Sequence, residues 1–276
     1  MRLFKFILSH SLFISFCAAA LTCQTFILLK FPINISICNF IFFATLGSYN
    51  AYWVLCKWSF DKKEEKAFLY SNYLYNILFI LISAIGFLYY LLLIPELLIF
   101  VLVAFFFTFL YCLPFLLPTA SFNFKYLGII KTMLLSLTWT FVTIVFPAHH
   151  LIYTNFHELL FLFSVRFLLL FMLCIIFDSR DIIVDKFNGF QSIATDFTSR
   201  SVKMLMFISF IMYSTLLFCS NYFSILGGQF FVLLTTGVLA FLLYMLSFKK
   251  RSYYFYYFLV DGLMLFSALA SYLVTI

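Results

Sequence analysis

Charged residues are scarce in this chain: Asp, Glu, Lys and Arg make up only 10% of its 276 residues, whereas a soluble domain has about 25%. A soluble protein with 66% hydrophobic residues could not cover its surface with polar groups. The composition therefore excludes a soluble globular fold, and lipid is the solvent that fits it. Nucleic acid is not expected as a partner, because the basic residues behind the net charge of +7 stand mainly in short connections between apolar runs.

Patterns of disulfide-rich proteins, of zinc proteins and of several enzyme classes are also missing. The seven cysteines are scattered through apolar runs, and no Cys-x-x-Cys pair occurs. We therefore expect neither a disulfide nor a zinc site, and we interpret the cysteines as small apolar residues of membrane helices. The sequence has no Gly-rich phosphate loop, no Ser/His/Asp arrangement and no internal repeat. Lack of a repeat argues against a transporter, since many transporters are built from paired repeats.

Long apolar runs dominate what is present. Without water, a segment that crosses the bilayer must satisfy its own backbone hydrogen bonds, so an apolar run of about 20 residues predicts a helix. The apolar start of the chain imitates a signal peptide, but it continues to Leu29 and is interpreted as the first membrane helix. We predict one all-α integral membrane domain over residues 1–276, with about nine transmembrane helices near 6–29, 36–56, 68–92, 97–117, 127–147, 158–177, 203–220, 226–247 and 253–275.

Lysine and arginine alternate between the two sets of predicted connections. One set has Lys30 alone, and cytoplasmic loops of membrane proteins are the ones that carry an excess of basic residues. This asymmetry predicts a cytoplasmic N-terminus and a C-terminus outside, in a multi-pass protein that we expect in a bacterial inner (plasma) membrane. The cytoplasmic set contains Arg2, Lys5, Lys57, Lys62, Lys63, Lys66, Lys125, Arg180, Lys186, Arg200, Lys203, Lys249, Lys250 and Arg251.

The connection between the sixth and seventh predicted helices is the most acidic part of the chain. Asp178, Asp181 and Asp185 follow one another at i, i+3 and i+7, which places them on one face of a helix. Like charges on one face repel unless a cation lies between them, and Mg²⁺ commonly bridges carboxylates to phosphates. On spacing alone, the preferred interpretation is a solvated loop whose acids are balanced by Arg180 and Lys186. The alternative is a Mg²⁺ site for a ligand with a charged head and a lipid tail.

This segment resembles the second aspartate-rich motif of the UbiA superfamily of intramembrane prenyltransferases. Asp178, Asp181 and Asp185 fall on the acidic positions of that motif, and Gly189 falls on its glycine. Two further stretches are similar to the family. Tyr111 lies in Leu-Tyr-Cys-Leu-Pro at the end of the fourth predicted helix, and Lys131 precedes Leu-Ser-Leu-Thr-Trp in the fifth.

The resemblance implies a fold of nine helices around a central cavity. It also implies transfer of a prenyl group from a prenyl diphosphate to a lipophilic acceptor, with Mg²⁺ as cofactor. On this hypothesis, Asp178, Asp181 and Asp185 bind the metal. The expected diphosphate-binding residues are Asn50, Lys57, Tyr111, Lys131 and Arg180.

The first aspartate-rich motif of the family is incomplete in this chain. Asn50 matches its asparagine, but Ala51, Leu55 and Ser59 stand at its three aspartate positions. Half of the expected metal ligands are therefore missing, and impaired activity is expected. The alternative is a non-catalytic UbiA-fold membrane protein that binds an isoprenoid lipid or a protein partner.

Two charged residues fall inside predicted helices, where a charge is costly and faces a partner or a cavity. Arg166 lies in the sixth helix, and we expect it to pair with Glu158 or Asp261 or to extend its charged end toward the membrane surface, with contact to a diphosphate or lipid headgroup as the alternative. Asp261 lies in the ninth helix, and we expect a structural hydrogen bond there.

Overall fold

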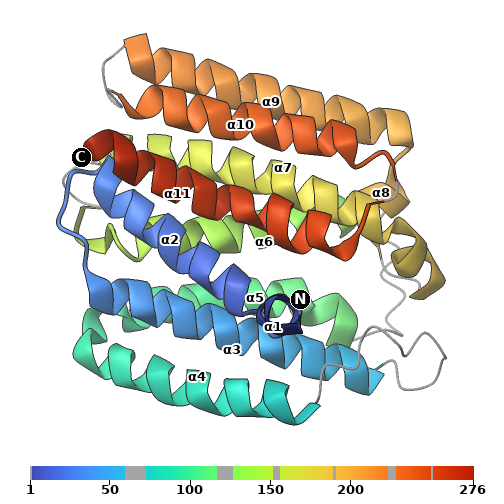
Figure 1. Cartoon of the computed structure of the whole chain (residues 1–276), viewed down its shortest axis with the longest axis horizontal. Helices are drawn as coiled ribbons and strands as arrows, with labels where there is room; N and C mark the ends of the chain where they lie inside the picture. The colour runs from blue at the N-terminus through green and yellow to red at the C-terminus, as the bar shows by residue number, and fades with distance from the viewer. Residues whose placement is uncertain are drawn as a thin grey trace.

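The computed structural model describes residues 2–59, 73–116, 127–151, 156–188, 191–222, 228–249 and 251–276. These residues form helices and no strand, which confirms the prediction of an all-α chain. Most of the helices run side by side along one direction (Figure 1). The elements are α1 (Arg2–Ser9), α2 (Leu12–Leu28), α3 (Ile35–Ser59), α4 (Tyr73–Leu93), η1 (Pro95–Leu97), α5 (Leu98–Leu116), α6 (Leu127–Thr140), η2 (Phe141–Val145), η3 (His149–Leu151), α7 (Phe156–Asn188), α8 (Ile193–Asp196), α9 (Ser199–Tyr222), α10 (Gln229–Leu246), η4 (Phe255–Val260) and α11 (Asp261–Thr275).

Each predicted membrane segment overlaps a helix of the structure. Among the described residues, 7 helices are long and apolar enough to cross a membrane: α4, η1 with α5, α6 with η2, α7, α9, α10, and η4 with α11. The chain is therefore a multi-pass membrane protein. The bent pair of α1 and α2 would raise the number to 8. The total of nine spans and the orientation in the membrane stay predictions.

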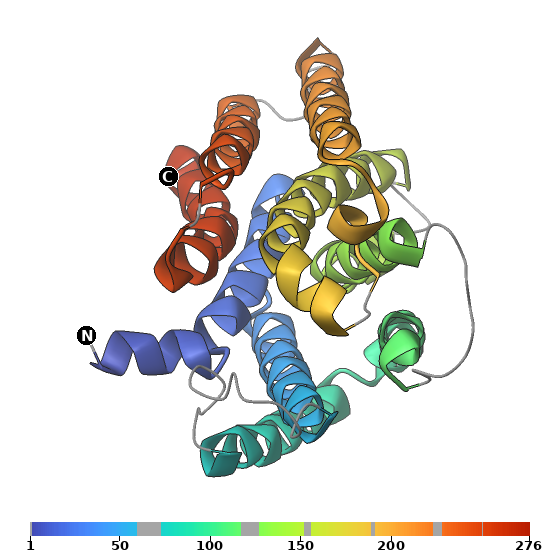
Figure 2. The same cartoon turned by 90° about the vertical axis from the view of Figure 1, so that its right-hand side faces the viewer.

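The first predicted helix, 6–29, is two helices in the structure, so the prediction of one continuous helix is wrong. α1 and α2 meet at an angle of 67°, at Ser11, whose φ of 62° is rare for a residue with a side chain. Asn50 of α3 donates a hydrogen bond of 3.0 Å to the carbonyl of His10 and so stabilises the bend between α1 and α2. α1 is seen end-on in Figure 1 and lengthwise in Figure 2, and thus lies across the other helices.

α7 is the central helix of the bundle, because 67% of its apolar span is buried, against 39% or less for the other six. It packs against α6 on one side and against α9 and α10 on the other. Met172, Ile175 and Ile176 of α7 are fully buried in the main hydrophobic core. α2 packs between α3 and α11, as the end-on view of Figure 2 also shows. The end of α7 is therefore held on a rigid and well-packed helix.

Gly237 of α10 lies against the ring of Tyr213 of α9, and a Cβ at this position would overlap that ring. Tyr213 is fully buried, and its hydroxyl donates a hydrogen bond of 2.6 Å to the carbonyl of Leu233. We expect Gly237→Ala to separate the two helices and to lower the free energy of unfolding by about 1–3 kcal/mol. Thermal unfolding in detergent measures the change.

The matched control is Gly262→Ala in α11. The nearest atom to a Cβ there is Cζ of Phe13, at 3.6 Å, which is ordinary contact. This substitution should therefore be neutral, or stabilising by up to about 1 kcal/mol through helix propensity. Equal effects of the two substitutions would contradict the packing account.

Candidate functional site

The acidic segment is the continuation of α7 beyond its apolar part. α7 runs for 33 residues to Asn188, so Asp178, Asp181 and Asp185 lie on a helix, as their spacing predicts. A helix of this length spans about 50 Å, whereas the hydrocarbon core of a bilayer is about 30 Å thick. The last turns of α7 therefore extend out of the apolar layer, where charged side chains can meet a polar headgroup.

Asp178 connects α7 to α6 and α8. The hydroxyl of Thr132 in α6 donates a hydrogen bond of 2.5 Å to Oδ2 of Asp178. The backbone N–H of Ile193, at the start of α8, also interacts with this carboxylate, and the Lys131 ammonium attracts it. Asp178 is thus a structural link as well as a candidate ligand, because its carboxylate already has partners on two neighbouring elements.

Lys131 interacts with an aromatic ring and with two carboxylates of the predicted site. Its ammonium stands 5.5 Å from the centre of the Tyr111 ring on α5, at a cation–π distance. It attracts Asp178 and Asp185, and Asp185 also interacts with the hydroxyl of Ser192. We call Tyr111, Lys131, Asp178 and Asp185 the Lys131 cluster. Lys131 therefore lies within interaction range of three other predicted site residues.

Arg180 and Asp181 form an ion pair beside the Lys131 cluster, and both interact electrostatically with Asp185. Nε and Nη2 of Arg180 donate to the two oxygens of Asp181 at 2.7 and 2.6 Å. The guanidinium also lies 5.0, 5.2 and 4.8 Å from the ring centres of Phe177, Tyr256 and Tyr257. Nη1 is buried and has no hydrogen-bond partner among the described residues. Asp181 is therefore engaged by its own neighbour, and Arg180 also interacts with the hydroxyl of Tyr257.

The predicted metal site can be tested against these positions. Among the residues that the structure describes, no group of three or more His, Cys, Asp and Glu side chains could hold a metal ion. Asp178, Asp181 and Asp185 thus do not form a metal cage by themselves. Asp178 and Asp185 fit the other way in which proteins bind Mg²⁺, with one or two carboxylates and with phosphate oxygens and water completing the shell. The Mg²⁺ assignment stays a prediction on this basis.

The other predicted site residues are placed differently. Asn50 uses its amide nitrogen within the protein, since Nδ2 donates to the carbonyls of His10 and Leu46 at 3.0 and 2.8 Å. Its Oδ1 is buried without a hydrogen-bond partner among the described residues, and an acceptor does not attract an anion. Lys57 belongs to α3, but its side chain lies outside the described residues, as does the whole of Gly189.

The junction between α6 and α8 was not expected from the sequence. Oδ2 of Asp196 accepts a hydrogen bond of 2.8 Å from the backbone N–H of Gly128, one of the free donors at the start of α6. A Cβ on Gly128 would overlap the backbone of Ser192, so the two elements touch directly. Ser192 and Thr195 form a capping box for α8. The pattern Ser-x-x-Thr at residues 192–195 could have predicted the start of α8, because a capping box marks the beginning of a helix.

Arg166 does not pair with Glu158 or Asp261, so that prediction is wrong. Its guanidinium donates to Oε1 of Gln24 at 2.9 Å and to the carbonyl of Leu21 at 3.2 Å, both on α2. The distance to the hydroxyl of Thr143 is 3.4 Å. Spacing along the chain could not identify these partners, since they are neutral groups on other helices.

Two π-helical turns carry partners of the two arginines, and such turns are frequent at functional sites. η2 contains Thr143, which contacts Arg166, and η4 contains Tyr256 and Tyr257, which stack on Arg180. Asp261 directly follows η4, is 7% exposed and interacts electrostatically with Arg180. The buried acid of α11 therefore has a cation as neighbour, while its predicted structural hydrogen bond stays a prediction.

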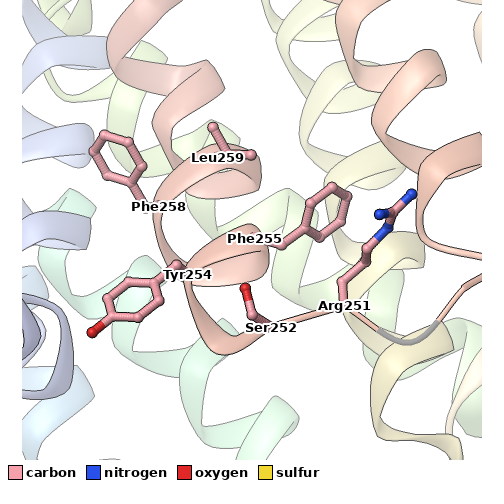
Figure 3. Close-up of a pocket in the computed structure, with 6 residues that line it drawn as sticks. All are labelled: Arg251, Ser252, Tyr254, Phe255, Phe258 and Leu259. Carbon is pink, nitrogen blue, oxygen red and sulfur yellow. The ribbon is translucent and has the colours of Figure 1, made fainter.

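Two surface grooves lie away from the Lys131 cluster. The first, of about 440 Å³, is bounded by the guanidinium of Arg251 beside Phe255 on one side and by Tyr254 and Phe258 on the other (Figure 3). The second, of about 530 Å³, lies at the connection from α2 to α3 and includes His149 and His150. Neither groove is lined by a predicted site residue, so the predicted central cavity stays a prediction.

Comparison with known proteins adds no assignment: no family model, no curated protein and no solved structure matches this chain.

Proposed function

We propose that the chain is a diverged UbiA-like membrane prenyltransferase, which transfers a prenyl group from a prenyl diphosphate to a lipophilic acceptor with impaired turnover. The observation that supports this function best is the composition of the Lys131 cluster. A lysine, a tyrosine and two carboxylates meet where α7 leaves the apolar layer. Such a site suits a ligand whose head is anionic and whose tail is apolar.

The residues of the chain divide the chemistry between them. The ammonium of Lys131 and the guanidinium of Arg180 would bind diphosphate oxygens. Asp178 and Asp185 would bind Mg²⁺, which when present neutralises negative charge on a diphosphate. The C–O bond of the prenyl diphosphate breaks with its electron pair on the diphosphate, and the acceptor carbon then bonds to the allylic cation. The C–H bond of that acceptor carbon would break last, with its proton passing to the released diphosphate. The rings of Tyr111 and Tyr257, which face Lys131 and Arg180, would stabilise the allylic cation.

A second candidate is a non-catalytic membrane protein with the same fold, which binds an isoprenoid lipid or a protein partner. The internal bonding of the acidic segment favours it. Asp181 is held by Arg180 and Asp178 by Thr132, and no aspartate stands at positions 51, 55 and 59. A site with fewer metal ligands can keep affinity for the ligand without the charge that drives departure of the diphosphate.

The proposed location is a bacterial inner membrane with the Lys131 cluster on the cytoplasmic side. This orientation rests on the basic residues, because half of the described lysines and arginines lie near the end of α7, at the start of α9 or just after α10. These are Arg180, Lys186, Arg200, Lys203, Lys249 and Arg251. Membrane lipid is the expected surrounding partner. The groove beside Arg251 would then face the cytoplasmic headgroups.

Binding of geranylgeranyl diphosphate tests the proposal. We expect calorimetry on the detergent-solubilised protein to detect binding that requires Mg²⁺. Asp185→Asn should weaken this binding by roughly 10–100-fold, the range that loss of a metal-site partner causes. Glu96→Gln is the matched control, since Glu96 is an exposed carboxylate near His149, outside the cluster.

The outcomes separate the two candidates. Binding followed by release of diphosphate and labelling of a phenolic or quinone-like acceptor supports the transferase. Mg²⁺-dependent binding without turnover over a range of acceptors favours the non-catalytic protein. No binding by the folded wild-type protein would overturn both of these isoprenoid functions.

A further inference from the structure

The thiols of Cys23 and Cys38 face each other across the contact between α2 and α3. Their sulfur atoms are 3.1 Å apart, about 1 Å more than the length of a disulfide bond, ~2.05 Å. Cys38 is 6% exposed, whereas Cys23 is only partly buried. This geometry needs a small movement of two side chains to become a covalent bond.

The short connection between the two helices keeps the thiols together. The cysteines are 15 residues apart, and the chain turns at Lys30, which has a φ of 59°. The N–H of Phe31 donates to the carbonyl of Phe26 at 2.9 Å, so the end of α2 is tied to the turn. Oδ1 of Asn34 caps α3 by accepting from the N–H of Ser36 at 3.0 Å. Both helix ends are thus fixed locally, and the approach of the two sulfurs does not depend on distant parts of the fold.

The connection between α2 and α3 lies at the end of the bundle where Lys30 is the only lysine or arginine in the predicted connections. On the predicted orientation it faces the outer compartment, and disulfides form and persist in such compartments. The groove of about 530 Å³ that includes Phe26 and Ile37 opens at this connection. Ile37 of this groove directly precedes Cys38, while neither cysteine belongs to the lining.

In contrast to the expectation from the sequence, we propose that Cys23 and Cys38, which are free thiols in the structure, form a disulfide bond in the native membrane. The two S–H bonds break and one S–S bond forms, while two electrons and two protons reduce the disulfide of a thiol-exchange oxidant to a dithiol. Cys23, the more exposed thiol, attacks the oxidant, and Cys38 then displaces it from the mixed disulfide. The bond would join α2 to α3 within a smaller hydrophobic core that contains Cys38, Phe26 and Phe40. Neither the acidic segment nor the proposed transferase function enters this inference.

Alkylation in intact membranes tests the proposal. Membranes are treated with N-ethylmaleimide before detergent is added, and the digested protein is examined by mass spectrometry. We expect a linked peptide pair containing Cys23 and Cys38. After denaturation, a maleimide–polyethylene glycol reagent should label two fewer of the seven cysteines than it labels after reduction. Cys17→Ser is the matched control and should leave the linked pair in place.

Stability gives a second measurement. Reductant should lower the Tm of the wild-type protein by ~5 °C, since a disulfide restricts the unfolded chain, and should not change the Tm of the Cys23→Ala, Cys38→Ala double variant. Alkylation of both thiols in the native membrane would overturn the proposal, and so would a bond that forms only after solubilisation. These outcomes do not depend on whether the protein binds a prenyl diphosphate.

Discussion

Arg166→Ala is expected to lower the free energy of unfolding by about 3–5 kcal/mol, through a cavity and through buried acceptors left without a donor. The guanidinium is 3% exposed and bonds two acceptors on α2, the carbonyl of Leu21 and Oε1 of Gln24. Gln24 in turn donates to the hydroxyls of Ser267 and Ser271 on α11, both at 2.8 Å. The loss of Arg166 therefore breaks one network that joins α7, α2 and α11.

Thermal unfolding of the purified protein in detergent measures this effect. Both substitutions remove the buried charge. Arg166→Met should lower the free energy of unfolding less than Arg166→Ala does, because methionine fills most of the volume of the arginine side chain. The matched control is Arg200→Ala, since Arg200 is exposed at the start of α9. Our account fails if Arg166→Ala and Arg200→Ala unfold at the same temperature.

Lys131→Met is expected to weaken Mg²⁺-dependent binding of geranylgeranyl diphosphate by about 100-fold, or roughly 2.7 kcal/mol. The substitution removes the cation that would meet the diphosphate, and it leaves Asp178 and Asp185 to repel each other and the ligand. Lys131→Arg should keep part of the affinity, because a guanidinium can also stack on the ring of Tyr111. Calorimetry gives the affinity, and thermal unfolding shows whether each variant is folded.

Lys203→Met is a closely matched control for this experiment. The ammonium of Lys203 lies 4.7 Å from the ring centre of Phe248, so it is also a lysine over an aromatic ring. It belongs to α9 and not to the Lys131 cluster, and its loss should leave affinity unchanged. A comparable loss of affinity in both variants would show that general positive charge, and not this cluster, attracts the ligand.

Several features of the site were predictable from residues 178–185 alone. The spacing of Asp178, Asp181 and Asp185 indicates a helix, and α7 is helical throughout this segment. Spacing also suggested that the three carboxylates act together. In the structure Arg180 donates two hydrogen bonds to Asp181, so the carboxylate of Asp181 is held by a cation of its own segment. The partners Thr132 and Ile193 come from other elements, so no pattern within the segment could indicate them.

By itself the sequence determined that the chain is an all-α membrane protein and where its helices lie, because each apolar run must satisfy its own backbone hydrogen bonds in lipid. Tertiary structure alone decided the break at Ser11, the neutral partners of Arg166 and the approach of Cys23 to Cys38. These features depend on contacts between different helices. Hydropathy and spacing describe one segment at a time, whereas the partner of a buried side chain is set by which helices pack together and at what depth.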